Sequence, residues 1–168
     1  TDANLHGVDL SGKNLSGIIL NGANLSYADL TNANLSEADL SDAILTNADL
    51  SDAILTNANL SDAILQWASL NNANLSGANL SNADLTSSKF VNANLSNAIL
   101  ENVTVLDTYL TGTNLMNADL SNTLFIGTSL EVWLAALHWK GQSSGHQDQH
   151  IDDNTVFIGA DFSNSILT

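Results

Sequence analysis

The chain has 168 residues, enough for one domain with a substantial buried core. It carries 18 acidic residues against 3 basic ones, for a net charge of -15 at pH 7. Such a surface repels phosphate backbones and anionic lipid, so we expect no direct nucleic acid binding and no membrane insertion. The sequence has no cysteine, which excludes disulfides, thiol nucleophiles and cysteine-based metal sites.

Leucine recurs at every fifth position from Leu5 to Leu130, and only Phe90, Val105 and Phe125 replace it. A helix advances about 100° per residue, so leucines five apart would scatter around its axis. A flat strand alternates faces with period two, so these leucines would point to both sides of a sheet. The period therefore predicts a chain that turns a corner in every five-residue unit and points all its leucines inward.

A small residue stands two places before most of the leucines, and it is alanine in most units from Ala23 to Ala98; Val8, Lys13 and Ile18 depart from this in the first coil. This predicts a second inward position where little more than a methyl group fits. The other positions hold Ser, Thr, Asn, Asp and Gly, which suit turns, and asparagine tolerates positive φ. From residue 103 the small position changes to valine and then largely to threonine. We expect these threonine hydroxyls to bond nearby backbone: Thr108, Thr113, Thr123 and Thr128.

The repeat reads A(D/N)LXX, as in Ala23-Asn24-Leu25, Ala48-Asp49-Leu50 and Ala83-Asp84-Leu85. With this motif the chain resembles the pentapeptide-repeat family, most closely its cyanobacterial members, over residues 1–130 and again near the end. The resemblance implies an all-β solenoid: a right-handed quadrilateral parallel β-helix with four pentapeptides per coil. Some cyanobacterial members are exported to the periplasm or thylakoid lumen. The chain also starts at Thr1 rather than methionine, so we expect an exported compartment slightly more than the cytoplasm.

The repeat stops after Leu130, and residues 131–140 read as a short amphipathic helix. Thr128 and Glu131 have the spacing of a capping box at its start. Because an open coil end presents unpaired strand edges, we expect this helix to form a short C-terminal α-helical cap. The alternative is a docking helix for another protein or for a homodimer through a coil end. Either role would use Trp133, Leu134, Leu137 and Trp139.

We divide the single domain into three segments. Residues 1–130 form the pentapeptide-repeat β-helix, residues 131–154 an excursion of helix plus polar loop, and residues 155–168 terminal repeats that complete the last coil. Phe125 and Leu130 would fill two sides of that coil, Phe157 and Phe162 would complete it, and Leu167 would begin the next.

Four units per coil place residues 20 apart in columns, which predicts a candidate interaction surface. Asp9, Asp29 and Asp49 form one column about 4.8 Å apart, and Asp42 and Asp62 form another. Like charges at that separation favour a cation or a basic partner, either as a weak calcium site or as a docking surface. The alternative is a solvated surface on which Asp and Asn interchange. Exposed aromatics often mark contact surfaces, and we expect them on the face of the first column: Tyr27, Trp67 and Tyr109, with Lys89.

No nucleophile, phosphate-loop or HExxH signature is present in the sequence, so we expect no enzyme and no cofactor. The first hypothesis is a structural or protein-interaction scaffold that acts through its acidic outer faces on an unknown protein partner. The second is a DNA mimic directed at DNA gyrase, although one net charge per roughly 2.8 Å of rod is sparser than about 1.7 Å for duplex DNA. The third is a metal-binding segment at residues 138–153, with His138, His146 and His150.

Overall fold

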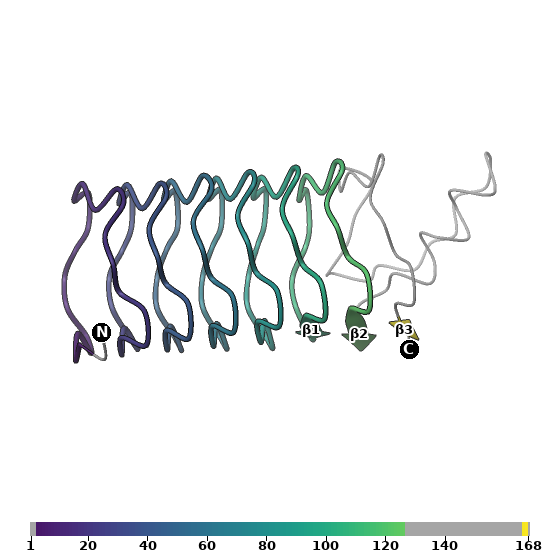
Figure 1. Ribbon diagram of the computed structural model, residues 1–168, viewed down its shortest axis with the longest axis horizontal. Coiled ribbons are helices and arrows are strands. Elements are labelled where there is room, and N and C mark those ends of the chain that lie inside the picture. The colour runs from purple at the N-terminus through teal and green to yellow at the C-terminus, as the bar shows by residue number, and fades with distance from the viewer. Residues whose placement is uncertain (1–2, 127–165, 168) are drawn as a thin grey trace.

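The computed structural model describes residues 3–126 and 166–167. The described chain winds as a regular coil whose turns lie side by side along one long axis (Figure 1). Parallel β-bridges join residues 20 apart, and four bridge positions recur in each coil, as in Asn4↔Asn24, Asp9↔Asp29, Asn14↔Asn34 and Ile19↔Asp39. The predicted coil of four five-residue units is therefore confirmed.

A unit with Asn or Asp before its leucine can satisfy all five of its backbone N–H groups, as the unit from Asn24 to Ala28 illustrates. Three of the N–H groups bond to neighbouring coils, one closes the turn within the unit, and one bonds to the unit's own asparagine side chain. A chain with this arrangement leaves no donor to be buried without a partner. The five acceptors, in chain order, are Ala3 O, Ile44 O, Asn24 Oδ1, Thr46 O and Leu25 O.

The second residue after each leucine lies at the corner of the coil with positive φ. From Gly7 to Asn122 every such corner position has φ between 51° and 70°, in eighteen non-glycine and six glycine residues. Only glycine, and to a lesser extent asparagine and aspartate, adopts this left-handed conformation at low cost. The composition of the repeat follows from this demand. Four corner residues are of other types: Tyr27, Glu37, Trp67 and Ser87.

The interior is a column of leucine and alanine. Leucines from Leu20 to Leu120 are buried together with the alanines that stand two places before most of them, and Phe90 and Phe125 take two of the leucine positions. The predicted threonine bonds are confirmed for the three threonines that the structure describes. Their hydroxyls donate to the carbonyls of Leu85, Phe90 and Leu100 at 2.6 to 2.8 Å: Thr108, Thr113 and Thr123.

Three strands of the described chain form a parallel sheet in the order β1-β2-β3: β1 (Thr104–Leu106), β2 (Leu124–Ile126) and β3 (Ile166–Leu167). Phe125 pairs with Leu167, so β3 lies beside β2 in the register that the sequence predicts (Figure 1). The predicted helix, with Trp133, Leu134, Leu137 and Trp139, falls on residues that the structure does not describe and stays a prediction. The boundaries at residues 131–154 and 155–168 also stay predictions.

Candidate interaction surface

Four columns of side chains make up the candidate surface, and they lie next to one another around the coil. The acidic corner carries Asp42 and Asp62, and the isoleucine face that follows it in each coil carries Ile44, Ile64 and Asp84. The aromatic corner comes next, with Tyr27, Trp67, Ser87 and Asp107. The last column is the aspartate face, where bridges join Asp9, Asp29, Asp49, Ser69, Lys89 and Tyr109.

The carboxylates of the aspartate face hold the turns of their own units. An Oδ1 atom of Asp29 accepts the backbone N–H of Thr31 at 3.0 Å and its hydroxyl at 2.7 Å, and Asp9 makes the same pair of bonds with Ser11. Asp49 accepts the N–H of Ser51 at 2.9 Å. An asparagine can accept the same N–H bond, which explains why Asp and Asn interchange at this position.

Hydrogen bonds also lower the pKa values of three carboxylates that lie on different faces of the coil. The bonds from Ser11 lower the pKa of Asp9, and those from Ser41, followed by a weaker one from Asn59, lower the pKa of Asp39. Desolvation raises the pKa of Asp84, but the bonds that its carboxylate accepts from Thr86 and Gln66 outweigh it, and the net pKa is lowered. These groups are therefore carboxylates at neutral pH and are engaged in structure.

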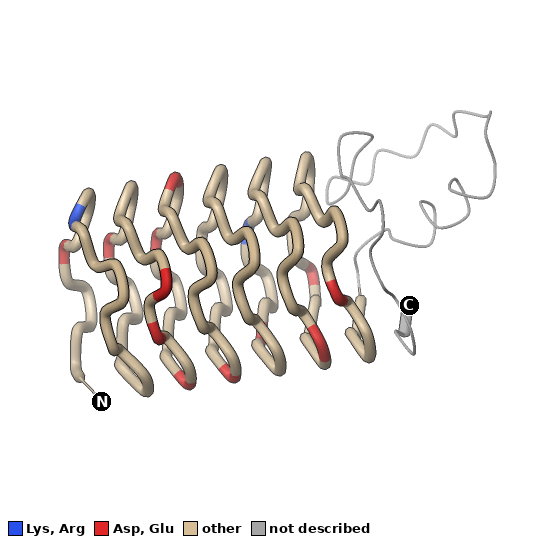
Figure 2. Tube along the Cα trace, turned by 45° about the horizontal axis from the view of Figure 1, so that its top comes forward, with Lys and Arg blue, Asp and Glu red and all other residues tan. Residues whose placement is uncertain are grey.

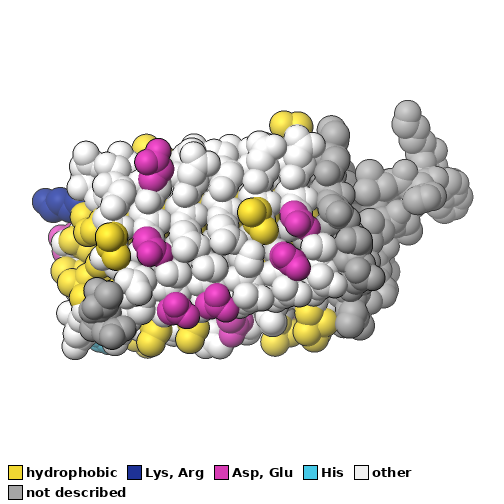
Figure 3. Space-filling model, viewed as in Figure 1, with side chains coloured by type: hydrophobic (Ala, Val, Ile, Leu, Met, Phe, Trp, Pro, Cys, Tyr) yellow, Lys and Arg dark blue, Asp and Glu magenta, His cyan; other side chains and the backbone are white. Residues whose placement is uncertain are grey.

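The two carboxylates of the acidic corner differ from those of the aspartate face. Asp42 and Asp62 are exposed, with φ of 57° and 59°, and their side chains accept no hydrogen bond from any other described residue. They lie at a position where asparagine is common, so their charge is not required by the fold. Acidic residues occur on several sides of the rod (Figure 2), and on the view in Figure 3 they are interspersed with apolar side chains.

The aromatic side chains occupy two adjacent columns rather than one. Tyr109 lies on the aspartate face, next to Lys89, as predicted. Tyr27 and Trp67 lie at the aromatic corner instead, so the expectation that they share the face was wrong. The five-residue period places them in the turn, where φ is 60° and 61°. Their side chains are 60% and 61% exposed, and Tyr27 contacts the His6 ring with centroids 5.4 Å apart.

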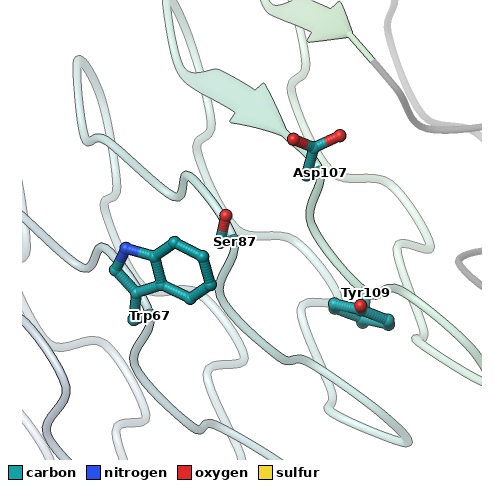
Figure 4. Close-up of a pocket in the computed structure, with 4 residues that line it drawn as sticks. All are labelled: Trp67, Ser87, Asp107 and Tyr109. Atoms are coloured by element: carbon teal, nitrogen blue, oxygen red, sulfur yellow. The ribbon is translucent and has the colours of Figure 1, made fainter.

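A shallow hollow of about 310 Å³ separates Trp67 from Tyr109. Ser87 and Asp107 complete its lining, and Figure 4 shows Ser87 between the indole ring and the Asp107 carboxylate. Sequence reasoning missed both residues. They could have been found by counting forward in steps of 20 from Trp67, which places them on the next two coils of the same corner.

The apolar part of the candidate surface lies on the isoleucine face. Ile44 and Ile64 are bridged neighbours and are 36% and 37% exposed. Isoleucine cannot accept the N–H bond that asparagine accepts in other units, so these side chains are not explained by the turn.

Metal-ligating side chains do not gather within residues 3–126, where no three or more His, Asp or Glu residues could hold one ion. The predicted metal segment at residues 138–153 lies outside the described residues. Within the described part of the chain, no helix has the length and apolar character needed to cross a bilayer.

Comparison with known proteins gives one family. A family model described as pentapeptide repeats matches the chain in eight copies over residues 1–36, 33–72, 63–102 and 106–131. A comparison with curated proteins found no match.

Several solved structures are similar to this chain. A pentapeptide repeat protein from Nostoc Pcc 7120 is 42% identical over 51% of this chain and 69% of its own, with a TM-score of 0.48. One from the cyanobacterium Cyanothece 51142 is 30% identical over 88% and 90%, with a TM-score of 0.43. One from the Arabidopsis thaliana thylakoid lumen is 26% identical over 86% and 84%, with a TM-score of 0.29. The compartment of the present chain stays a prediction.

The matched repeats cover well over half of the chain. In the described coil, the same five-residue unit occurs four times in every 20-residue turn. The chain belongs to the pentapeptide repeat family.

Proposed function

We propose that the protein is a non-enzymatic protein-interaction scaffold, and that it binds through the candidate interaction surface. The observation that carries this proposal is the placement of Tyr27 and Trp67. Both are large, exposed aromatics at corner positions whose left-handed backbone favours glycine or asparagine. A side chain kept where the backbone resists it is a candidate for function, and exposed aromatics are common anchors of protein interfaces.

The chemistry of the surface supports binding rather than catalysis. General acid–base catalysis works best with a pKa close to the operating pH, whereas the aspartates with shifted values here have lowered pKa values. The interior is filled by leucine and alanine, and the hollow beside Trp67 is shallow. A catalytic site would need a more enclosed pocket.

The expected partner is a protein with a basic surface. The chain carries a net charge of -15, so charge complementarity speeds association with a cationic partner and disfavours acidic ones. Asp42 and Asp62 contribute charge to the surface, and Ile44 and Ile64 contribute exposed apolar area beside them. Apolar and charged side chains that lie next to each other in this way are typical of protein interfaces.

The proposal is tested by cross-linked affinity capture from a native lysate, with identification of the captured proteins by mass spectrometry. The intact chain is compared with a double variant that carries Tyr27→Asn and Asp42→Asn. Both substitutions introduce asparagine, the residue found most often at the corners. We expect one protein to be captured by the intact chain and strongly reduced with the variant.

The matched control is Asp52→Asn, which removes a corner charge from a different column. Loss of the captured protein with this control would show a nonspecific charge effect and contradict the proposed surface. Capture that is equal with all three proteins would also contradict it. If the captured protein is DNA gyrase and the chain inhibits supercoiling, the DNA-mimic alternative replaces the scaffold proposal.

A further inference from the structure

The hollow at the aromatic corner has the composition of a site for an organic cation. Trp67, Ser87 and Asp107 come from three successive coils of that corner, and Tyr109 stands two residues after Asp107 on the third coil (Figure 4). Coil spacing of about 4.8 Å places Trp67 and Tyr109 about two spacings apart along the rod. The small, buried side chain of Ser87 leaves the space between them open.

We propose that this hollow binds the guanidinium group of an arginine in a basic segment of the protein partner. The face of an aromatic ring attracts a cation through its quadrupole, and a carboxylate attracts it by charge. Arginine suits the hollow better than lysine, because a planar guanidinium can stack on Trp67 while its N–H groups donate to Asp107. The inference rests on the proposed function and names the side chain that the surface recognises.

The surrounding charges favour a cation that arrives from the corner. On the isoleucine face, Asp84 is a carboxylate that accepts hydrogen bonds from Thr86 and, at 2.7 Å, from the side chain of Gln66, which precedes Trp67 in the chain. On the aspartate face, Lys89 is the ladder neighbour of Tyr109 and is exposed. The ammonium group of Lys89 repels a guanidinium that approaches from that side. The guest therefore has its most favourable approach between Trp67 and Asp107, away from Lys89.

The backbone adds an independent argument. Trp67 and Ser87 have φ of 61° and 58°, although neither residue type favours the left-handed region. At the same corner Gly7 and Asn47 occupy equivalent positions with the residues that the turn prefers. Replacement of Trp67 by asparagine would relieve this conformational cost. The presence of Trp67 and Ser87 at these two positions is therefore explained better by binding than by folding.

The test uses the full chain and three blocked peptides that are identical except at a central arginine, lysine or citrulline. Citrulline keeps the size of arginine but has no charge. Binding is followed by the NMR shift of the Trp67 indole N–H, assigned by its loss in Trp67→Asn. We expect saturable binding of the arginine peptide and at least about ten-fold weaker binding of the citrulline and lysine peptides.

Four variants keep the repeat motif and locate the site: Trp67→Asn, Asp107→Asn and Tyr109→Asn, with Asp52→Asn as the matched control. Asp52 lies at another corner with φ of 60° and does not line the hollow. Because Trp67→Asn has no indole signal at this position, binding to all four variants is followed by the NMR shift of the Ser87 backbone amide. Folding is checked by circular dichroism. The first three should each weaken arginine binding several-fold, and the control should leave it unchanged.

Equal binding of the citrulline or lysine peptide would overturn the arginine assignment. Unchanged binding in folded Trp67→Asn, or equal loss with Asp52→Asn, would overturn the site. The two proposals fail separately. A partner that is captured through Tyr27 and Asp42 but is indifferent to Asp107→Asn would leave the scaffold proposal standing and remove the arginine site.

Discussion

The faces of the coil and its corners make different demands on a side chain, although both recur every five residues. Most face residues fill the interior, as Leu60 does, or accept the hydrogen bond that holds the next turn, as Asp39 does. A corner residue such as Asp62 points to solvent and need only adopt positive φ. These face positions are therefore constrained by folding, whereas corner positions can vary more freely with function.

The largest expected effect of breaking a face position comes from the interior. Leu60→Ala removes a fully buried side chain from a column of leucines and should lower the free energy of unfolding by about 2–5 kcal/mol. Asp62→Asn, two residues later at a corner, should change it by less than about 0.5 kcal/mol. Urea unfolding of both variants measures the difference. Equal effects would contradict the division between faces and corners.

The turn acceptor on a face gives the next largest effect. Asp39→Ala removes the acceptor for the Ser41 N–H at 3.1 Å and its hydroxyl at 2.7 Å, and should cost about 1 kcal/mol. Asp39→Asn keeps the acceptor for the N–H and should cost much less. Thermal unfolding of the pair separates the hydrogen bond from the charge, and a loss as large in the asparagine variant would assign the effect to charge.

A corner can be made more stable. Glu37 is exposed with φ of 59°, and its side chain makes no hydrogen bond or ion pair within the described residues. Glu37→Asn should raise the free energy of unfolding by about 0.5–1 kcal/mol, because asparagine adopts the left-handed region more readily. The control is Asp52→Asn, which exchanges two tolerant residues. A stabilisation of the same size in this control would point to relief of negative charge instead.

The pH dependence should be the smallest effect and belongs to the faces. The pKa values of Asp39 and Asp84 are lowered in the folded chain, so their ionised forms stabilise it above the unfolded value of about 3.9. This contribution is lost as the pH falls through the lowered folded values. Melting temperatures between about pH 6 and pH 2 should fall less steeply in Asp39→Asn with Asp84→Asn than in the parent chain. An unchanged slope would contradict this assignment.

The sequence alone determined most of the coil. Leucine every five residues, with alanine two places earlier, allows only a chain that turns in every unit, and the family resemblance supplied the four units per coil. The register at Leu167 followed from the same counting. These features are readable because each unit repeats the same local demands, and 20-residue spacing converts sequence position directly into spatial neighbours.

The tertiary structure decided which side chains are committed to folding and which are available for binding. The sequence placed Asp29 and Asp42 in different columns but treated both as exposed charges, whereas the structure shows that one holds a turn and the other is displayed at a corner. The hollow at Trp67 also emerged only from the fold, because its lining comes from three coils and its depth depends on the small side chain of Ser87. Periodicity fixes where a residue lies, whereas its hydrogen bonds and its exposure depend on the neighbouring coils.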